Sequence, residues 1–157
     1  MIFIRAAVEG DVSLILAMLH ASARDQGFAD EVVVTEDDLR ADGFGAHPRF
    51  NALIAEFDGS AAGMALYFFN YSTWGSRLGL YLEDLYVAAE FRRRGLAPAM
   101  MRRLARIAFD EGCGRFQWVV NRGNEHAIRM YESLGAKSLH EWMLMTVGAA
   151  DISNLAD

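Results

Sequence analysis

Cysteine and long apolar runs are scarce in this sequence: 157 residues contain one cysteine and no apolar stretch long enough to span a bilayer. The single Cys113 excludes an internal disulfide framework and fits a reducing cytoplasm, where we expect the protein to reside. No basic segment followed by an apolar one opens the chain, so we expect no signal peptide. The four histidines have no metal-ligand spacing with each other or with Cys113, and we expect no metal site.

Positive charge is also scarce. The 15 lysines and arginines against 21 aspartates and glutamates give a net charge of −6 at pH 7. Because phosphate contacts need a basic surface, this composition argues against a nucleic-acid partner. It is compatible with a cationic substrate, although many cytoplasmic proteins are mildly acidic for solubility alone.

The length suits a single domain over residues 1–157, and no linker or repeat interrupts it. Periodicity and turn residues predict the order β-α-α-β-β-β-α-β-α-β. The predicted strands are residues 2–6, 50–57, 62–71, 78–87, 115–120 and 141–147; the predicted helices are 11–21, 35–42, the segment after Gly95, and 124–134; residues 148–157 form a tail with little periodicity. Three antiparallel strands before a β-α-β unit indicate an α/β (α+β) domain on a mixed sheet.

The most informative segment is YLEDLYVAAEFRRRGLA, residues 81–97, which reads as a strand, a turn and R-x-x-G-x-A at a helix start. A glycine turn at a helix N-terminus exposes unpaired N–H groups, and the helix dipole adds partial positive charge, so the junction suits a phosphate or pyrophosphate. It is neither a complete Rossmann fingerprint nor a P-loop. Taken alone, it is equally compatible with a purely structural turn.

A second motif, Asn124-x-x-Ala127-x-x-x-Tyr131, follows the next predicted strand. If Asn124 caps the helix, Ala127 lies one turn in, where a small side chain permits close approach of a ligand. Tyr131 then lies two turns from Asn124 on nearly the same face.

The two motifs together resemble the GCN5-related N-acetyltransferase (GNAT) superfamily, whose members bind acetyl-CoA. Four segments further resemble diamine (spermidine/spermine) N-acetyltransferases: VTEDDLRADGFGAHPRF, MALYFFNYSTW, YLEDLYV and NEHAIRMYESLGAKSLHEW. The resemblance implies a GNAT-type, mostly antiparallel central sheet flanked by helices. It also implies direct acetyl transfer from acetyl-CoA to a primary amine of a small cationic substrate, and a homodimer with active sites near its interface.

The resemblance also implies roles for the motif residues. The backbone of 85–87, at a splayed strand edge, would pair with the pantetheine arm, and N–H groups of 93–97 would hold the pyrophosphate. Tyr131 would be the general acid, since a phenol with a reference pKa of about 10 has a proton to give at neutral pH. The predicted cofactor-binding residues are Leu85, Tyr86, Val87, Arg92, Arg93, Arg94, Gly95, Leu96, Ala97, Asn124, Ala127 and Tyr131.

Glu83 and Asp84 precede the predicted cofactor-binding strand end, where an ammonium group must be recognised and deprotonated. Strand alternation puts the two carboxylates on opposite faces, so only one of them can point directly into a single cleft. We favour Glu83 as substrate ligand and base, through a water, with Asp84 as second choice. The alternative is that Glu83 and Asp84 simply face solvent and have no role in the reaction. Trp74, Glu141 and Trp142 match substrate-lining positions of the resembled family. A tryptophan beside carboxylates suits an aliphatic ammonium chain, but either tryptophan is equally compatible with core packing.

The sequence departs from the family pattern in several places. Arg93 and Ala97 replace common glycines, and Pro98 lacks an N–H. Ser72 stands where diamine enzymes usually have an acid, and the first loop reads Asp25-Gln26-Gly27-Phe28 where they favour acidic and aromatic residues. Fewer carboxylates weaken the prediction of a long polyamine and favour a shorter diamine or a lysine-like amino acid.

Three alternatives stay open on the sequence alone. They are an acetyltransferase for a peptide or antibiotic amine, a non-catalytic acyl-CoA-binding regulator, and a structural or interaction protein. The presence of both Asn124 and Tyr131 argues against the regulator. Cys113 lies far from the motifs in sequence, so we do not expect an acetyl-cysteine intermediate.

Overall fold

The computed structural model describes residues 1–156 and divides them into two compact units, Met1–Asn121 and a second unit from Arg122 onward. The first unit contains β1 (Ile2–Ala6), α1 (Val12–Gln26), α2 (Glu36–Phe44), β2 (Asn51–Phe57), β3 (Ser60–Ser72), β4 (Arg77–Val87), α3 (Leu96–Asp110) and β5 (Arg115–Gln117). Three short 3-10 turns join these elements: η1 (Glu9–Asp11), η2 (Ala29–Glu31) and η3 (Ala89–Phe91). The second unit contains α4 (Glu125–Ser133) and α5 (Ala149–Leu155).

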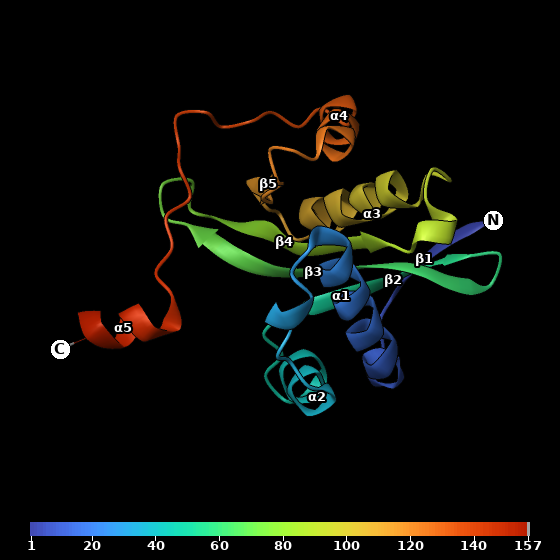
Figure 1. Ribbon diagram of the computed structural model, residues 1–157. Helices are drawn as coiled ribbons and strands as arrows, with labels where there is room; N and C mark the ends of the chain where they lie inside the picture. The colour runs from blue at the N-terminus through green and yellow to red at the C-terminus, as the bar shows by residue number, and fades with distance from the viewer. Residues whose placement is uncertain (157) are drawn as a thin grey trace. The chain divides into compact units, whose positions relative to one another are not determined.

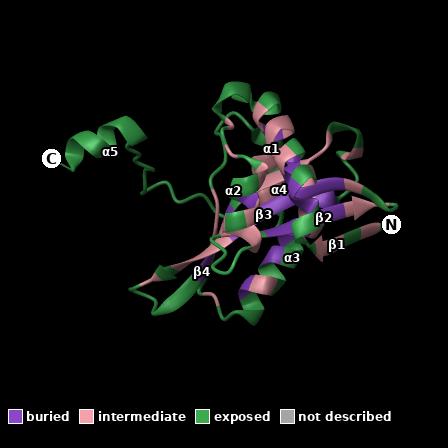
Figure 2. Ribbon diagram, turned by 90° about the horizontal axis from the view of Figure 1, so that it is seen from below, coloured by how far each residue is buried: buried purple, intermediate pink, exposed green. Residues whose placement is uncertain are grey.

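The sheet of the first unit has the strand order β1-β2-β3-β4-β5, and only β4 and β5 run parallel. Helices α1 and α2 cover one face and α3 covers the other (Figure 1). The buried residues gather on the central strands and on the sheet-facing sides of α1 and α3 (Figure 2). The predicted mixed, mostly antiparallel sheet flanked by helices is confirmed.

Local sequence signals explain several element boundaries. The Thr35 hydroxyl accepts a hydrogen bond from the Asp38 N–H at 3.2 Å, and the Asp38 carboxylate accepts from the Thr35 N–H at 2.9 Å. This reciprocal capping box starts α2 where the sequence predicted. Asp58 and Gly59 both have positive φ, 50° and 81°, as a tight two-residue hairpin between β2 and β3 requires.

Other boundaries differ from prediction. Helix α1 runs to Gln26, five residues beyond its predicted end, and stops where Gly27 turns left-handed with φ 83°. The predicted strand 115–120 is only three residues long, β5.

The prediction of a final strand at 141–147 is wrong for this structure, because these residues form no regular element. A strand needs a partner for its backbone hydrogen bonds, and the described part of the second unit offers only α4 and α5. In the tail, Ala149–Leu155 form α5, with every residue exposed, a helix that the weak periodicity of this segment did not indicate. That the whole chain is one domain stays a prediction. Among the described residues, no helix has the length and apolarity to cross a membrane.

Gly63 on β3 allows a close approach to β4. It pairs with Val87, and a Cβ added here would lie 2.5 Å from the Tyr86 carbonyl oxygen and 3.3 Å from Met100 Cε. We expect Gly63→Ala to lower the free energy of unfolding by about 1–3 kcal/mol, because backbone must move to accommodate the methyl group. Denaturant unfolding checks this against Gly10→Ala, where an added Cβ meets nothing within 4 Å. Equal stability of the two variants would contradict the steric argument.

Candidate functional site

The edge of β4 opens beyond Tyr81. Strands β4 and β5 pair only from Gly79–Arg115 to Tyr81–Gln117, whereas β4 continues to Val87. From Leu82 to Val87, β4 therefore pairs with β3 alone in the described sheet. This is the splayed strand edge expected at Leu85, Tyr86 and Val87, and its backbone groups can accept an extended ligand.

A β-bulge in β4 decides which acidic side chain faces which side of the sheet. Tyr67 pairs with Leu82 and the next residue, Leu66, pairs with Asp84, so Glu83 is the extra residue. Opposed residues share a face, and Leu66 belongs to the core cluster under α1 and α2. Asp84 therefore lies on the α1–α2 face of the sheet. Simple alternation, on which the prediction of opposite faces for Glu83 and Asp84 rested, does not hold at this point.

The two carboxyl groups also differ in environment. Glu83 is exposed, whereas Asp84 is half-buried. Burial, and secondarily the negative charge of Glu83, raises the pKa of Asp84 from 3.8 to about 6. A carboxyl group with this pKa is ionised at neutral pH and holds a proton more firmly than an exposed one. Asp84 thus has the properties of a proton acceptor, and Glu83 those of a surface anion.

The turn between β4 and α3 has an unusual backbone. Arg93 adopts φ 61° and Gly95 φ 85°, and α3 begins at Leu96. The first N–H groups of a helix have no intrahelical acceptor, so this end can hold an anion, with one donor fewer because of Pro98. Because only glycine adopts positive φ without strain, the backbone of Arg93 is strained at this position.

The three arginines of the turn have different surroundings. Arg92 Nε donates to the Val87 carbonyl at 3.0 Å, and its guanidinium also pairs with Asp25. The Arg94 guanidinium carbon lies 5.0 Å from the ring centroid of Phe57. Arg93 is exposed, and it makes neither of these kinds of contact with residues 1–156. Arg92 is thus engaged in hydrogen bonds within the described protein, whereas the exposed Arg93 and Arg94 side chains are available to a phosphate.

Replacing Arg93 with glycine separates strain from charge. We expect Arg93→Gly to raise the free energy of unfolding by about 1 kcal/mol, because the left-handed conformation no longer strains a Cβ. Arg93→Ala removes the same charge but keeps the Cβ, so it should not be stabilised. Thermal unfolding of both variants checks this. A stabilised alanine variant would show that relief of backbone strain is not the cause.

The second unit presents the other predicted motif on α4. The Asn124 side-chain oxygen accepts a hydrogen bond from the Ala127 N–H at 3.2 Å, so the predicted helix cap is confirmed. Tyr131 is half-buried, and burial raises the pKa of its phenol. The phenol is therefore protonated at neutral pH, as a proton donor must be.

The remaining predicted substrate residues are exposed. Trp74 lies in the turn between β3 and β4 with 94% of its surface accessible, and Trp142 in the second unit is 72% accessible. Trp74 is thus not part of the core of the first unit, and Trp142 is not packed within the second unit. Glu141 is exposed as well. Within the described residues, no group of three or more His, Cys, Asp or Glu side chains could hold a metal ion.

Sequence reasoning missed one residue of this region, Asp25. It is 67 residues from its partner Arg92, and no local motif signals a pair of this kind. Only the packing of α1 beside the end of β4 brings the two residues together.

Comparison with known proteins supports the family resemblance. A sequence model of the acetyltransferase (GNAT) family matches residues 15–136. The thialysine N-epsilon-acetyltransferase of Sus scrofa is 40% identical over 148 residues, which cover 89% of this chain and 86% of that protein. The human spermidine/spermine N(1)-acetyltransferase-like protein 1 is 32% identical over 98% of this chain, but over only 23% of its own length.

The fold itself is shared with more distant proteins. An integron cassette protein from the mobile metagenome of V. cholerae superposes with a TM-score of 0.82 over 99% of this chain and 97% of its own, at 23% identity. This likeness concerns the fold alone. The family match and the identity of the relatives carry the assignment, and the chain belongs to the acetyltransferase (GNAT) family.

Proposed function

We propose that the protein transfers an acetyl group from acetyl-CoA to a primary amine of a lysine-like amino acid, or of a short diamine or polyamine. Relatives named for thialysine and for spermidine or spermine support this substrate class. The observation that carries the proposal is the half-buried Asp84, placed immediately before the open edge of β4 at 85–87. A proton acceptor there adjoins a strand edge that pairs with no further strand in the described sheet and can therefore bind an extended ligand.

Acetyl-CoA, when bound, supplies the thioester whose acetyl group is transferred. The backbone of Leu85, Tyr86 and Val87 would hold the pantetheine arm. N–H groups from Arg93 to Ala97 would hold the pyrophosphate, assisted by the Arg93 charge. Asn124 and Ala127 would contribute to the cofactor site from α4. The donor set fits the group, since it combines an open strand edge with a helix N-terminus.

Proton movement involves two further residues. Asp84 would accept the proton of the ammonium substrate, directly or through a water, so that the amine nitrogen can attack the thioester carbonyl. Tyr131 would donate its phenolic proton to the leaving sulfur. Glu83 and Trp74 would bind the aliphatic ammonium chain through charge and cation–π contact, with Glu141 and Trp142 as further substrate contacts.

An amine panel tests this function. Release of free CoA is measured with thialysine, lysine, putrescine, spermidine, spermine, a lysine-containing peptide and an aminoglycoside. We expect the highest kcat/KM with a lysine-like amine or a short diamine, because Ser72 replaces the acid usual in diamine enzymes. Preference for the peptide or the aminoglycoside would contradict the proposed substrate class. CoA binding without any product would favour a regulator.

We further propose that the enzyme is a cytoplasmic homodimer. The exposed segment 139–147 of the second unit supports this proposal, because it presents apolar side chains that a second copy of the chain could cover. Its exposed apolar residues are Leu139, Trp142, Met143, Leu144, Met145 and Val147. Four of them, Trp142–Met145, are consecutive, and exposed apolar side chains grouped in this way are unfavourable in water and typical of protein interfaces.

Light scattering coupled to size exclusion tests the dimer. We expect about twice the 17.5 kDa chain mass for the wild type, and a monomer when Met143, Leu144 and Met145 are replaced by serine. Replacing the exposed Ile152 and Leu155 of α5 by serine is the matched control and should leave the dimer intact. A monomeric wild type at micromolar concentration would reject the proposal.

A further inference from the structure

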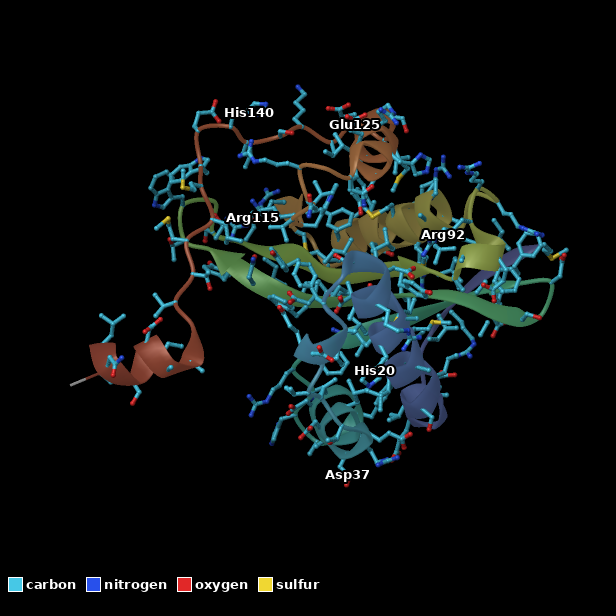
Figure 3. The ribbon with its side chains drawn as sticks, in the orientation of Figure 1. His20, Asp37, Arg92, Arg115, Glu125 and His140 are labelled. Atoms are coloured by element: carbon cyan, nitrogen blue, oxygen red, sulfur yellow. The ribbon has the colours of Figure 1, made fainter. Side chains whose placement is uncertain are left out.

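One side chain links three separate segments of the first unit. Arg92 Nη2 pairs with the Asp25 carboxylate in the last turn of α1. Its Nε donates to the Val87 carbonyl at the end of β4, and its guanidinium carbon lies 5.9 Å from the ring centroid of Tyr86. Arg92 itself precedes the turn that starts α3 (Figure 3). The ends of α1 and β4 are thereby joined at the start of this turn.

The Arg92 guanidinium is thus bound to other parts of the protein rather than directed at a ligand. Two of its three guanidinium nitrogens bond protein oxygens, and its charge is balanced by Asp25. The neighbouring Arg93 has an exposed side chain without such a partner. The motif position that the sequence assigns to cofactor binding is therefore occupied by a side chain directed at α1.

The segment after α1 has the chemistry of an ammonium-binding loop. Gly27 ends the helix, and the Phe28 N–H bonds the Ala23 carbonyl at 2.8 Å, which anchors the start of the loop to the last turn of α1. Phe28, Asp30 and Glu31 are all exposed. An aromatic ring and two carboxylates attract a cationic aliphatic amine. Helix α1 covers the face of the sheet on which Asp84 lies.

We propose that Arg92 is a positioning residue for the acceptor amine rather than a ligand of the pyrophosphate. Through Asp25 it holds the last turn of α1, and with it the loop 28–31, at the end of β4. The loop can then present its ring and carboxylates to the amine. The substrate part of this inference rests on the proposed function, whereas the holding of the loop does not.

The test is a double-mutant cycle of Asp25→Ala and Arg92→Ala. We expect each single variant to raise the amine KM by about three- to tenfold, which is a larger effect than on kcat or on the Kd for CoA. The double variant should be no worse than the worse single one, because both substitutions break the same link. The charge-swapped pair Asp25→Arg with Arg92→Asp should recover part of the lost affinity for amine. Asp110→Ala, which breaks the exposed Arg106–Asp110 pair on α3, is the matched control.

Amide hydrogen exchange gives a readout without turnover. Amides of residues 28–31 should exchange faster in both single variants than in wild type or in Asp110→Ala. Weaker CoA binding in Arg92→Ala together with unchanged or tighter binding in Asp25→Ala would identify Arg92 as a pyrophosphate ligand and overturn the proposal. Equal losses of kcat, CoA affinity and thermal stability would show a merely structural pair and would also overturn it. A wild type that acetylates no amine rejects the proposed function, and unchanged exchange at 28–31 would then separately reject the holding of the loop.

Discussion

Replacing Tyr131 with phenylalanine is expected to lower kcat by about 10²- to 10⁴-fold, the range that a general acid contributes. Without the phenolic proton the leaving sulfur must depart as a thiolate. Burial, which raises the pKa of Tyr131, keeps the wild-type phenol protonated over the whole neutral range. Because phenylalanine preserves the ring, the Kd for CoA and the amine KM should change little. Single-turnover mixing with saturating amine and acetyl-CoA measures the chemical step directly.

The matched control is Tyr67→Phe, which removes a hydroxyl from a buried tyrosine that faces α3 and lies outside the proposed site. This control should retain wild-type kcat. If Tyr131→Phe keeps its rate while chemistry limits turnover, Tyr131 is not the acid. If its Kd for CoA rises together with the loss of rate, Tyr131 contributes mainly to binding.

Replacing Asp84 with asparagine is expected to lower kcat/KM for the amine by about 10²- to 10³-fold, because the proton acceptor is lost. In the wild type, kcat/KM should fall as pH decreases through about 6, where the carboxylate becomes protonated. At higher pH, kcat/KM should rise again toward pH 10, because the ammonium group of the substrate loses its proton in that range. Asp84→Asn should lose the change in kcat/KM near pH 6 (the limb near pH 6) and keep the rise toward pH 10. A pH profile of kcat/KM measures both.

The free energy of unfolding of Asp84→Asn shows whether a loss of activity comes from loss of the base or from loss of the fold. The folded-state pKa of Asp84 lies above its model-peptide value of 3.8, so the folded state disfavours the charged form. The resulting destabilisation is absent below about pH 4, grows as pH rises, and is complete above about pH 6. Asp84→Asn should therefore be at least as stable as wild type at pH 7. Denaturant unfolding at pH 4 and pH 7 checks the sign.

Glu83→Gln is the companion variant. As an exposed bulge residue, Glu83 should affect the amine KM with little change in kcat or in the limb near pH 6. If Glu83→Gln abolishes that limb and Asp84→Asn does not, the two roles are reversed. Unchanged kinetics in Glu83→Gln would show that Glu83 has no role in substrate binding.

Much of the scaffold follows from local chemistry. Thr35 and Asp38 start α2, Asp58-Gly59 turns the hairpin, and Asn124 caps α4, each through side-chain bonds or dihedral preferences within a few residues. The R-x-x-G-x-A and N-x-x-A-x-x-x-Y motifs indicate the family for the same reason. Their function depends on backbone geometry that a short stretch of sequence determines.

Features that depend on contacts between residues distant in sequence could not be predicted from the sequence. The bulge at Glu83 arises from the pairing of β4 with β3, and it places Asp84 opposite Leu66, on the α1–α2 face. The Arg92–Asp25 pair joins residues distant in sequence, and the apolar segment 141–147 forms no strand without a pairing partner. The sequence by itself indicated the family, the elements of the first unit and the candidate residues, because these depend largely on local pattern. The tertiary structure decided which carboxylate is half-buried and what Arg92 contacts, because register and long-range packing set both.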